Sequence, residues 1–416
     1  MVITVFGLGF VGLTTALGFA ELGHTVYGVE LNENRMQTIK SGKLPFLEPG
    51  LDEALARHLG KSFIPCHDLS KAMEESDCVY YCVGTPYGED GQADLQYLFA
   101  AVEETLAQVK DDKFRVLVTK STVPPSTTSG KVVPFINEKG FVVGARVGVA
   151  NNPEFLREGH CWDDFINADR IVLGVSDETS AEVLKRLYEK MDCPIYTVSL
   201  NTGEYIKYLS NTSLACLISY ANEMSIAADT IGDIDVTQAF RILHMDKRWQ
   251  TGTIRAYFYP GCGYGGYCLP KDTNAFYAVT KTAGFDGQIL KQVIATNDAM
   301  PAVTAQRIMK ACGGEQNKTI GVLGLSFNPG SDDVRDTPSA KIIRALNEAG
   351  YRNIVAYDPV AMREFQVQYQ VECRCLQSGE AVLEKADVLV ITTAWPEFKS
   401  LCAQTDKPIV DCRYML

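Results

Sequence analysis

The sequence lacks an excess of positive charge. Its 51 acidic residues outnumber the 39 lysines and arginines, which gives a formal net charge of −12 at pH 7. A surface with this balance repels polyanions, so the sequence argues against broad binding of nucleic acid or of an anionic membrane. A local basic pocket for a phosphate group remains compatible with this charge.

Long apolar segments are also missing. No apolar run is long enough to span a bilayer, and no segment resembling a signal peptide precedes the apolar stretch Val2–Phe6. We therefore expect a cytoplasmic protein that has no membrane partner.

The 13 cysteines show no short repeated spacing of the kind that binds zinc. Cys373 and Cys375 form a C-x-C pair, which is a weak signal for a metal site. The sequence therefore predicts no metal site, and we expect thiols that are mostly reduced.

A chain of 416 residues is too long for one hydrophobic core, so we expect two or three domains. The 46% of hydrophobic and 22% of charged residues are ordinary for a globular protein.

The N-terminal segment has the pattern of a dinucleotide site. The apolar strand Val2–Phe6 leads into Gly7-Leu-Gly9-Phe-Val-Gly12, and a second strand, Thr25–Val29, ends on Glu30. Such glycines allow close approach of a pyrophosphate to a helix N-terminus, and the acid accepts hydrogen bonds from ribose hydroxyls. The pattern predicts NAD, because an acid at Glu30 repels a 2′-phosphate. Arg35 weakens the preference for NAD over NADP, since a nearby arginine accommodates that phosphate.

Three further apolar runs end on polar residues, at 84–86, 120–122 and 151–159. Ligands collect at the carboxyl ends of parallel strands, so these segments are candidate site residues. Ser121 and Thr122 could instead serve as turn or helix-cap residues. Glu154 and Glu158 would share one face if their segment were helical, and the alternative is a solvated helix face.

Residues 203–229 predict a long, mostly buried helix between two sheet domains. Lys207 and Asn211 lie four residues apart on it, and a buried lysine needs a partner or a shifted pKa. The alternative for the pair is an exposed polar stripe. The apolar surplus of the helix predicts packing against a second copy, and therefore a homodimer through residues 204–229.

A glycine-rich loop at 259–266 precedes Cys268, Lys271 and Asp272. Backbone with so little side chain can approach a ligand closely, and a cysteine at its end can face a substrate. The alternative is a turn that carries a packed cysteine.

The last third predicts a second, smaller doubly wound domain, with strands within 318–326, 353–357, 386–393 and 408–411 and a helix over Pro338–Glu348. It lacks a full G-x-G-x-x-G, so no second dinucleotide site is predicted. Arg335 and Arg413 are candidate phosphate clamps, and the alternative for either is a surface ion pair.

Taken together, these motifs resemble the UDP-glucose/GDP-mannose dehydrogenase family. The resemblance rests on Gly7–Gly12 with Glu30, and on Gly84-Thr-Pro86, Lys120-Ser-Thr-Val123, Asn152-Pro-Glu-Phe-Leu-Arg-Glu-Gly159, Glu204-x-x-Lys207-x-x-x-Asn211, Gly263–Asp272 and Ser331-Asp-Asp-Val-Arg335. It implies an α/β fold of two Rossmann-like doubly wound parallel-sheet domains joined by a long central helix. The implied domains are 1–198 for NAD, 199–300 for dimerisation and 301–416 for the UDP-sugar.

The implied activity is the NAD-dependent, four-electron oxidation of the C6 alcohol of a nucleotide sugar. The implied catalytic residues are Cys268 as nucleophile, Glu154 or Lys207 (or a water between them) as base, Lys207 and Asn211 as oxyanion donors, and Asp272 and Thr122 around the hydrolytic water.

The resemblance implies two sets of binding residues. Those for the cofactor are Gly7, Gly9, Gly12, Glu30, Arg35, Gly84, Thr85, Thr122, Glu158 and Arg335. Those for the substrate are Glu154, Phe155, Leu156, Arg157, Lys207, Asn211, Arg248, Tyr257, Tyr259, Gly265 and Arg413.

The chain departs from the family at two places. Asn328 stands where a substrate-contacting lysine is usual, and residues 251–260 form an insert that is similar to the GDP-mannose members. The cysteine loop, the 393–398 segment and the Asp411-Cys-Arg413 end are similar to the UDP-glucose members, so we expect UDP-glucose as the substrate. The alternatives are GDP-mannose or a UDP-N-acetylhexosamine, a 6-phosphogluconate-type single oxidation, or a non-catalytic nucleotide-sugar sensor.

Overall fold

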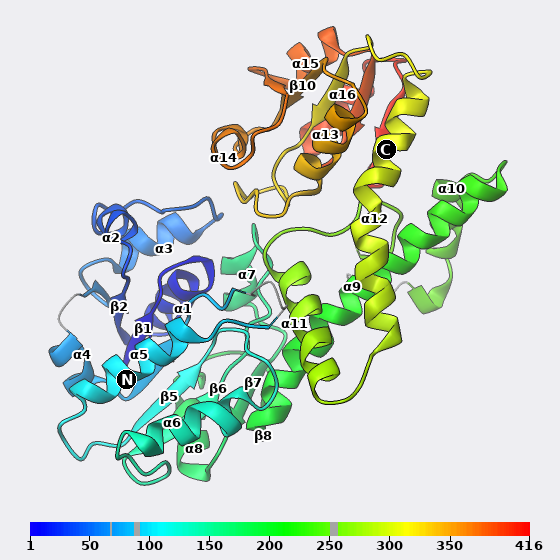
Figure 1. The fold of residues 1–416 in the computed structure, drawn as a ribbon. Coiled ribbons are helices and arrows are strands. Elements are labelled where there is room, and N and C mark those ends of the chain that lie inside the picture. Colours follow the sequence, from blue (N-terminus) through cyan, green and yellow to red (C-terminus); the bar gives the residue numbers. More distant parts are fainter. Residues whose placement is uncertain (67–68, 87–91, 250–256) are drawn as a thin grey trace. The chain divides into compact units, whose positions relative to one another are not determined.

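The computed structural model describes residues 1–66, 69–86, 92–249 and 257–416, which form two compact units, Met1–Ser210 and Asn211–Leu416. Each unit is built around a sheet with helices on both faces (Figure 1). Among the described residues, no helix is both long and apolar enough to cross a membrane.

The first unit holds one eight-stranded sheet in the order β3-β2-β1-β4-β5-β6-β7-β8. Its strands are β1 (Val2–Phe6), β2 (Thr25–Val29), β3 (Phe63–Pro65), β4 (Cys78–Tyr81), β5 (Arg115–Thr119), β6 (Val147–Asn151), β7 (Ile171–Val175) and β8 (Ile195–Ser199). The first six strands are parallel and follow the dinucleotide-binding order, whereas β7 pairs antiparallel to β6.

The helices of the first unit cover both faces of this sheet. They are α1 (Phe10–Glu21), α2 (Glu33–Lys40), α3 (Leu51–His58), α4 (Leu69–Glu75), α5 (Gln96–Gln108), α6 (Val133–Glu138), α7 (Cys161–Ile166) and α8 (Glu178–Leu187), with a π-helical turn η1 (Thr128–Val132). In β4, Cys78 and Tyr80 pack under α1, while Val79 and Tyr81 pack under α4 and α5. Burial on both faces explains why these strands are continuous apolar runs.

The second unit holds a five-stranded parallel sheet in the order β11-β10-β9-β12-β13. Its strands are β9 (Ile320–Leu323), β10 (Ile354–Tyr357), β11 (Arg374–Cys375), β12 (Val388–Ile391) and β13 (Ile409–Asp411). Its helices are α10 (Val236–Leu243), α11 (Cys268–Thr282), α12 (Gln288–Ala311), α13 (Pro338–Glu348), α14 (Met362–Gln368), α15 (Gly379–Lys385) and α16 (Pro396–Cys402), with a short turn η2 (Lys247–Trp249).

One continuous helix, α9 (Leu200–Ile231), begins in the first unit and ends in the second. The predicted fold class, two doubly wound domains joined by a long central helix, is therefore confirmed. The division of the chain into three domains, 1–198, 199–300 and 301–416, stays a prediction.

Arg115 anchors the start of β5. Its side chain is 1% exposed, and its guanidinium donates to the carbonyl oxygens of Met73 (2.8 Å) and Lys113 (2.9 Å) and to both carboxylate oxygens of Asp111 (2.5 and 2.7 Å). These bonds tie the strand to the C-terminal end of α4.

We predict that Arg115→Met lowers the free energy of unfolding of the first unit by roughly 2–3 kcal/mol, because it leaves buried carbonyl oxygens without donors. Arg57→Met is the matched control. The Arg57–Glu21 pair is 46% and 37% exposed, so its loss should cost less than about 1 kcal/mol. Urea denaturation of both variants measures the difference, and equal losses would contradict the anchoring role.

Candidate active site

The glycine loop between β1 and α1 has three glycines with different reasons for lacking a side chain. Gly7 has φ +84°, and a Cβ there would lie 2.8 Å from the carbonyl oxygen of Cys82. A Cβ on Gly12 would lie 1.7 Å from the carbonyl oxygen of Gly7, so the fold itself excludes it. Gly9 has an ordinary φ of −75°, and a Cβ there would meet nothing within 4 Å. The fold therefore does not require a glycine at this position. The close approach of a cofactor phosphate to the backbone would require one.

Glu30 lies directly beside this loop. Its carboxylate accepts from the backbone N–H groups of Leu8 (2.9 Å) and Asn32 (2.8 Å) and from the guanidinium of Arg35 (3.0 Å). Burial alone would raise the pKa of Glu30, but these donors outweigh it and hold the pKa below its usual value. Glu30 is therefore an anionic acceptor that fits ribose hydroxyls, and Arg35 is already paired with it.

The ends of β4 and β5 are joined by side-chain hydrogen bonds. Thr85 donates to the carbonyl oxygen of Thr122 (2.8 Å), and Ser121 donates to the carbonyl oxygens of Tyr81 (3.1 Å) and Val83 (2.6 Å). Gly84 between them is exposed. The predicted cofactor residues Gly84 and Thr85 thus lie next to Thr122.

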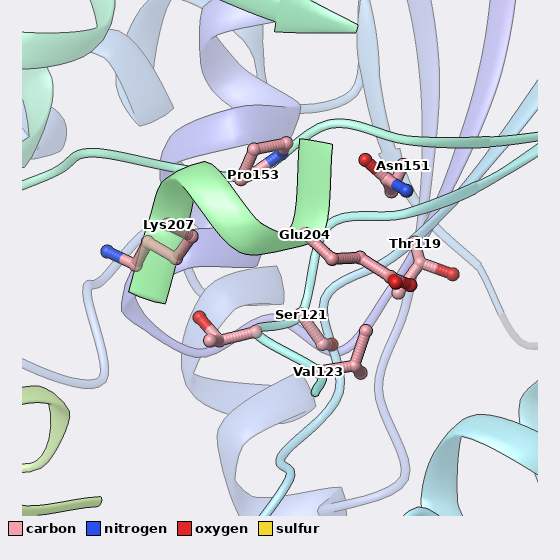
Figure 2. A pocket seen from close by; sticks show the side chains of 8 residues that line it. Thr119, Ser121, Val123, Asn151, Pro153, Glu204 and Lys207 are labelled. Atoms are coloured by element: carbon pink, nitrogen blue, oxygen red, sulfur yellow. The ribbon is translucent and has the colours of Figure 1, made fainter. Parts of the chain in front are cut away.

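A pocket opens at the carboxyl ends of β5 and β6, against α9 (Figure 2). It is lined by Thr119, Ser121, Thr122, Val123, Asn151, Pro153, Glu204 and Lys207. The side chains of Glu204 and Lys207 leave α9 in opposite directions in Figure 2. Glu204 accepts from the N–H of Thr128 (2.8 Å) and from its hydroxyl (2.5 Å), and burial raises the pKa of Glu204 to about 7.

The strongest interaction at this pocket is a buried ion pair. The ammonium of Lys207 lies 2.9 Å from the carboxylate of Glu154, and both side chains are 5% exposed. Burial alone would raise the pKa of Glu154, but Lys207 and the N–H of Leu156 hold it below its usual value. Lys207 also lies over the ring of Phe155, 5.7 Å from its centre. The predicted base candidates, Glu154 and Lys207, therefore contact each other.

The expectation that Glu154 and Glu158 share a helical face is wrong. Residues 152–157 belong to no helix or strand, and α7 begins only at Cys161. Pro153 disfavours helical backbone at the preceding Asn152, and the Glu154 carboxylate turns back to accept from the N–H of Leu156 (2.6 Å). Of the other predicted substrate residues here, Arg157 is exposed and pairs with Asp164 (2.6 Å).

The second unit holds its own polar cluster. The amide of Asn211 donates to the carboxylate of Asp272 (2.6 Å), whose other oxygen accepts from the ammonium of Lys271 (2.5 Å). Burial alone would lower the pKa of Lys271, but Asp272 raises it above its usual value. Asp272 is fully buried. Asn211 is also four residues after Lys207 on one continuous helix, so both lie on the same face of α9.

The glycine-rich loop is held by two buried amides that the sequence reasoning missed. Asn222 accepts from the N–H of Gly261 (2.7 Å), and Asn297 accepts from the N–H of Tyr264 (2.7 Å). A Cβ on Gly265 would lie 2.3 Å from the carbonyl oxygen of Asp336. In the sequence, each of these asparagines stands within a run of mostly apolar helical residues, and that placement was the signal that could have identified them.

Cys268 is the first residue of α11 rather than part of the loop, and its side chain is half-buried. Backbone N–H groups at a helix N-terminus favour negative charge, so the position suits a thiolate. Because Cys268 begins a helix, the turn of the alternative reading is absent at this position, and the catalytic role of the thiol stays a prediction.

The remaining predicted residues of the second unit lie in two places. Arg335 bonds with Asp333 (2.6 Å) and lies 4.5 Å from the centre of the Tyr267 ring. Tyr259 stacks on Tyr414 at 5.8 Å, and the N–H of Arg413 donates to Asp411 (2.8 Å).

The Nε of Arg413 is buried and has no hydrogen-bond partner within the described residues. It therefore has an N–H group to offer a ligand. Tyr257 is partly buried, and the side chain of Arg248 and most of the 251–260 insert, residues 251–256, lie outside what the structure describes.

Comparisons with known proteins agree along most of the chain. Models of the UDP-glucose/GDP-mannose dehydrogenase family match residues 1–192 (NAD binding domain), 201–299 (central domain) and 321–416 (UDP binding domain). The chain is 36% identical to a UDP-glucose 6-dehydrogenase of Rhizobium meliloti, over 96% of this chain and 91% of that protein. It is 34% identical to the UDP-glucose 6-dehydrogenase TuaD of Bacillus subtilis, over 96% of this chain and 85% of that protein.

Two solved structures are similar as well. A UDP-glucose dehydrogenase from Pyrobaculum islandicum has a TM-score of 0.90 and 37% identity, covering 99% of this chain and 94% of that one. A UDP-D-ManNAc dehydrogenase from Pyrococcus horikoshii has a TM-score of 0.84 and 28% identity, covering 100% of this chain and 96% of that one.

We predict that Gly9→Ala weakens NAD⁺ binding by about 10-fold or more, because its Cβ enters the open space that a pyrophosphate would use. The same change should alter the free energy of unfolding by less than about 0.5 kcal/mol. Gly12→Ala, in contrast, should destabilise the first unit, because its Cβ meets Gly7. Calorimetric titration with NAD⁺ and urea denaturation measure both, and unchanged NAD⁺ affinity in Gly9→Ala would contradict the close approach.

Proposed function

The chain belongs to the UDP-glucose/GDP-mannose dehydrogenase family, and from that premise we propose that it oxidises UDP-glucose to UDP-glucuronate in two NAD-dependent steps. The observation that carries the chemistry is the order of polar groups along α9. Lys207 is paired with Glu154, and one turn later Asn211 is paired with Asp272. The names of the similar enzymes support UDP-glucose as the sugar.

NAD⁺, once bound, supplies the hydride acceptor for both steps. The proposed cradle is the loop of Gly7, Gly9 and Gly12, with Glu30 on the ribose. The described residues fit the group, because Gly9 leaves free space and Glu30 is an anionic acceptor beside that loop.

In the first oxidation, a base must take the proton of the C6 hydroxyl while hydride leaves the carbon. The Glu154 carboxylate is ionised and held in place by Lys207, so it can accept that proton directly or through a water. The ammonium of Lys207 then stabilises the alkoxide that forms.

In the second oxidation, the Cys268 thiolate adds to the aldehyde carbon and gives a thiohemiacetal. Loss of hydride from the oxyanion form of the thiohemiacetal gives a thioester. Water then attacks the thioester carbon, the C–S bond breaks, and two protons leave to solvent as the carboxylate and the thiolate form. The helix N-terminus at Cys268 favours the thiolate. One N–H of Asn211 is bonded to Asp272, and its second N–H can donate to the oxyanion. Asp272 and Thr122 would position the hydrolytic water.

For the nucleotide part of the substrate we propose the remaining predicted residues. The buried, unpaired Nε of Arg413 supports a phosphate contact, and Tyr259 beside it supports an aromatic wall. Arg335 pairs with Asp333 and its side chain is 40% exposed, and we propose that it contacts the cofactor.

We propose a homodimer through residues 204–229 and a cytoplasmic location. The apolar side chains Tyr205, Leu209 and Tyr220 on α9 are 43%, 49% and 53% exposed, which supports coverage by a second copy.

The test is to incubate the protein with NAD⁺ and, separately, UDP-glucose, GDP-mannose and UDP-N-acetylglucosamine, and to follow NADH to completion. We expect two NADH per UDP-glucose and no more than one for Cys268→Ser, because serine cannot form the thioester. Cys193→Ser, a control of similar partial burial outside the proposed site, should behave as wild type.

Two NADH per molecule of another sugar would keep the mechanism and change the substrate. Tight binding of UDP-glucose with no NADH from any sugar would contradict the proposed enzyme and favour a sensor. Full acid production by Cys268→Ser would contradict the role of the thiol.

A further inference from the structure

A second buried lysine lies near the Glu154–Lys207 pair. Lys120 follows the end of β5, is 5% exposed, and donates to the side-chain oxygen of Asn152 (3.0 Å) and to its carbonyl oxygen (3.4 Å). Within the described residues, no carboxylate lies within ion-pair distance of its ammonium. A buried lysine with neutral hydrogen-bond partners alone is costly, so the position calls for an explanation.

The titratable groups that face Lys120 come from three neighbouring segments. They are Cys82 after β4, Glu154 after β6 and Lys207 on α9. Cys82 also packs against the glycine loop, because a Cβ on Gly12 would lie 3.0 Å from the Cβ of Cys82. The charge of Lys120 is therefore felt both by Cys82, which packs against the proposed cofactor loop, and by the Glu154–Lys207 pair.

With both lysines protonated, this buried group has two cations and one anion, and so carries one positive charge in excess. A buried excess charge interacts strongly with charge that forms nearby, because the surroundings screen it weakly. In the proposed first oxidation, the charge that forms is the alkoxide of the substrate. As Glu154 accepts the proton its own charge is lost, so the two cations of the cluster then face the alkoxide and stabilise it.

We propose that Lys120 is a positioning residue for the first oxidation. Its buried charge helps Lys207 keep Glu154 ionised before the reaction, and it adds a second cation that stabilises the alkoxide once Glu154 has accepted the hydroxyl proton. This inference rests on the proposed function, and Lys120 acts through Glu154 and Lys207 rather than by touching the substrate.

The charge on Lys120 depends on pH within an accessible range. Burial lowers the pKa of Lys120 to about 8, Cys82 and Glu154 oppose that shift, and Lys207 adds to it. Lys120 is charged below its pKa, so the excess cation is present at pH 7 and is lost as the pH rises through about 8. The rate of the first oxidation should then fall on the alkaline side.

A purely structural role for Lys120 makes a different prediction. Asn152 accepts from Lys120 and also from the hydroxyl of Tyr188 (2.6 Å), through the same side-chain oxygen. Tyr188→Phe removes one donor from Asn152 and no charge. If Lys120 serves only to hold Asn152, then Tyr188→Phe and Lys120→Met should have similar effects.

The experiment measures kcat and KM with UDP-glucose and NAD⁺ from pH 6 to 10 for wild type, Lys120→Met, Lys120→Arg and Tyr188→Phe, with the thermal midpoint of each. We expect Lys120→Met to lower kcat at pH 7 by roughly 10- to 100-fold with little change in the KM for the sugar. Lys120→Arg keeps the charge at all these pH values, so it should retain activity within a few-fold and lose the alkaline decline near pH 8. Tyr188→Phe should keep the wild-type pH profile.

Each other result overturns the inference. If Lys120→Met and Tyr188→Phe lower kcat equally, the role of Lys120 is structural. If the decline of the rate near pH 8 persists in Lys120→Arg, that decline does not come from the titration of Lys120. If Lys120→Met does not fold, Lys120→Arg still decides the question. A wild-type chain that reduces no NAD⁺ with UDP-glucose would overturn the proposed function as well, whereas an active wild type with unaffected Lys120 variants would overturn only this inference.

Discussion

The site depends on one buried ion pair, the 2.9 Å contact between Glu154 and Lys207. Removing two charges from water costs several kcal/mol per ion, and an apolar pair of equal volume would stabilise the fold at least as well. Stability alone is therefore a poor explanation for the pair, whereas the proposed proton removal by Glu154 accounts for it. The pair also joins the carboxyl end of β6 to α9. Through α9 the same face then presents Asn211, whose partner is Asp272.

The rest of each unit holds these groups rigidly. The carboxyl ends of β1, β4, β5 and β6 are neighbours in the parallel sheet, so the glycine loop, Thr85, Thr122 and Glu154 converge without long side chains. In the proposed function, dinucleotide binding and proton removal would use adjacent strand ends for this reason. In the second unit, Asn222 and Asn297 hold the glycine-rich backbone that precedes Cys268. Rigid elements therefore position the proposed reacting groups.

The sequence predicted the elements whose pattern is local. The bounds of β1, β2 and α13 agree with the expected ranges, because a strand buried on both faces and a helix with proline at its first position have clear signals. Strands β3, β7, β8 and β11 were not predicted. Strands β3 and β11 are only three and two residues long, and β8 is mostly exposed with no buried apolar run, whereas the apolar run of β7 was a signal that was overlooked. The helix start at Cys268 had a signal that was passed over, since Pro270 is typical of a first helical turn.

The sequence singled out many residues of the candidate site, but it did not predict their electrostatic arrangement. Lys120, Glu154 and Lys207 lie far apart in the sequence, and only the fold pairs Lys207 with Glu154 and buries Lys120 near that pair. Their charge states follow from burial and mutual distance, which no local pattern encodes. The helical placement of Glu154 and Glu158 failed for a related reason, because Pro153 and the inward turn of Glu154 override the spacing.

The central claim, that Cys268 carries the sugar as a thioester which water releases with help from Asp272, is tested most directly by trapping that species. Asp272→Asn should slow hydrolysis, so acid quenching after mixing with NAD⁺ and UDP-glucose, followed by intact-mass measurement, should find the uronyl nucleotide bound to the protein. Peptide mapping should place this adduct on Cys268, and Cys268→Ser in the same background should abolish it. Two NADH per sugar from Asp272→Asn at the wild-type rate, with no adduct on Cys268, would contradict the account.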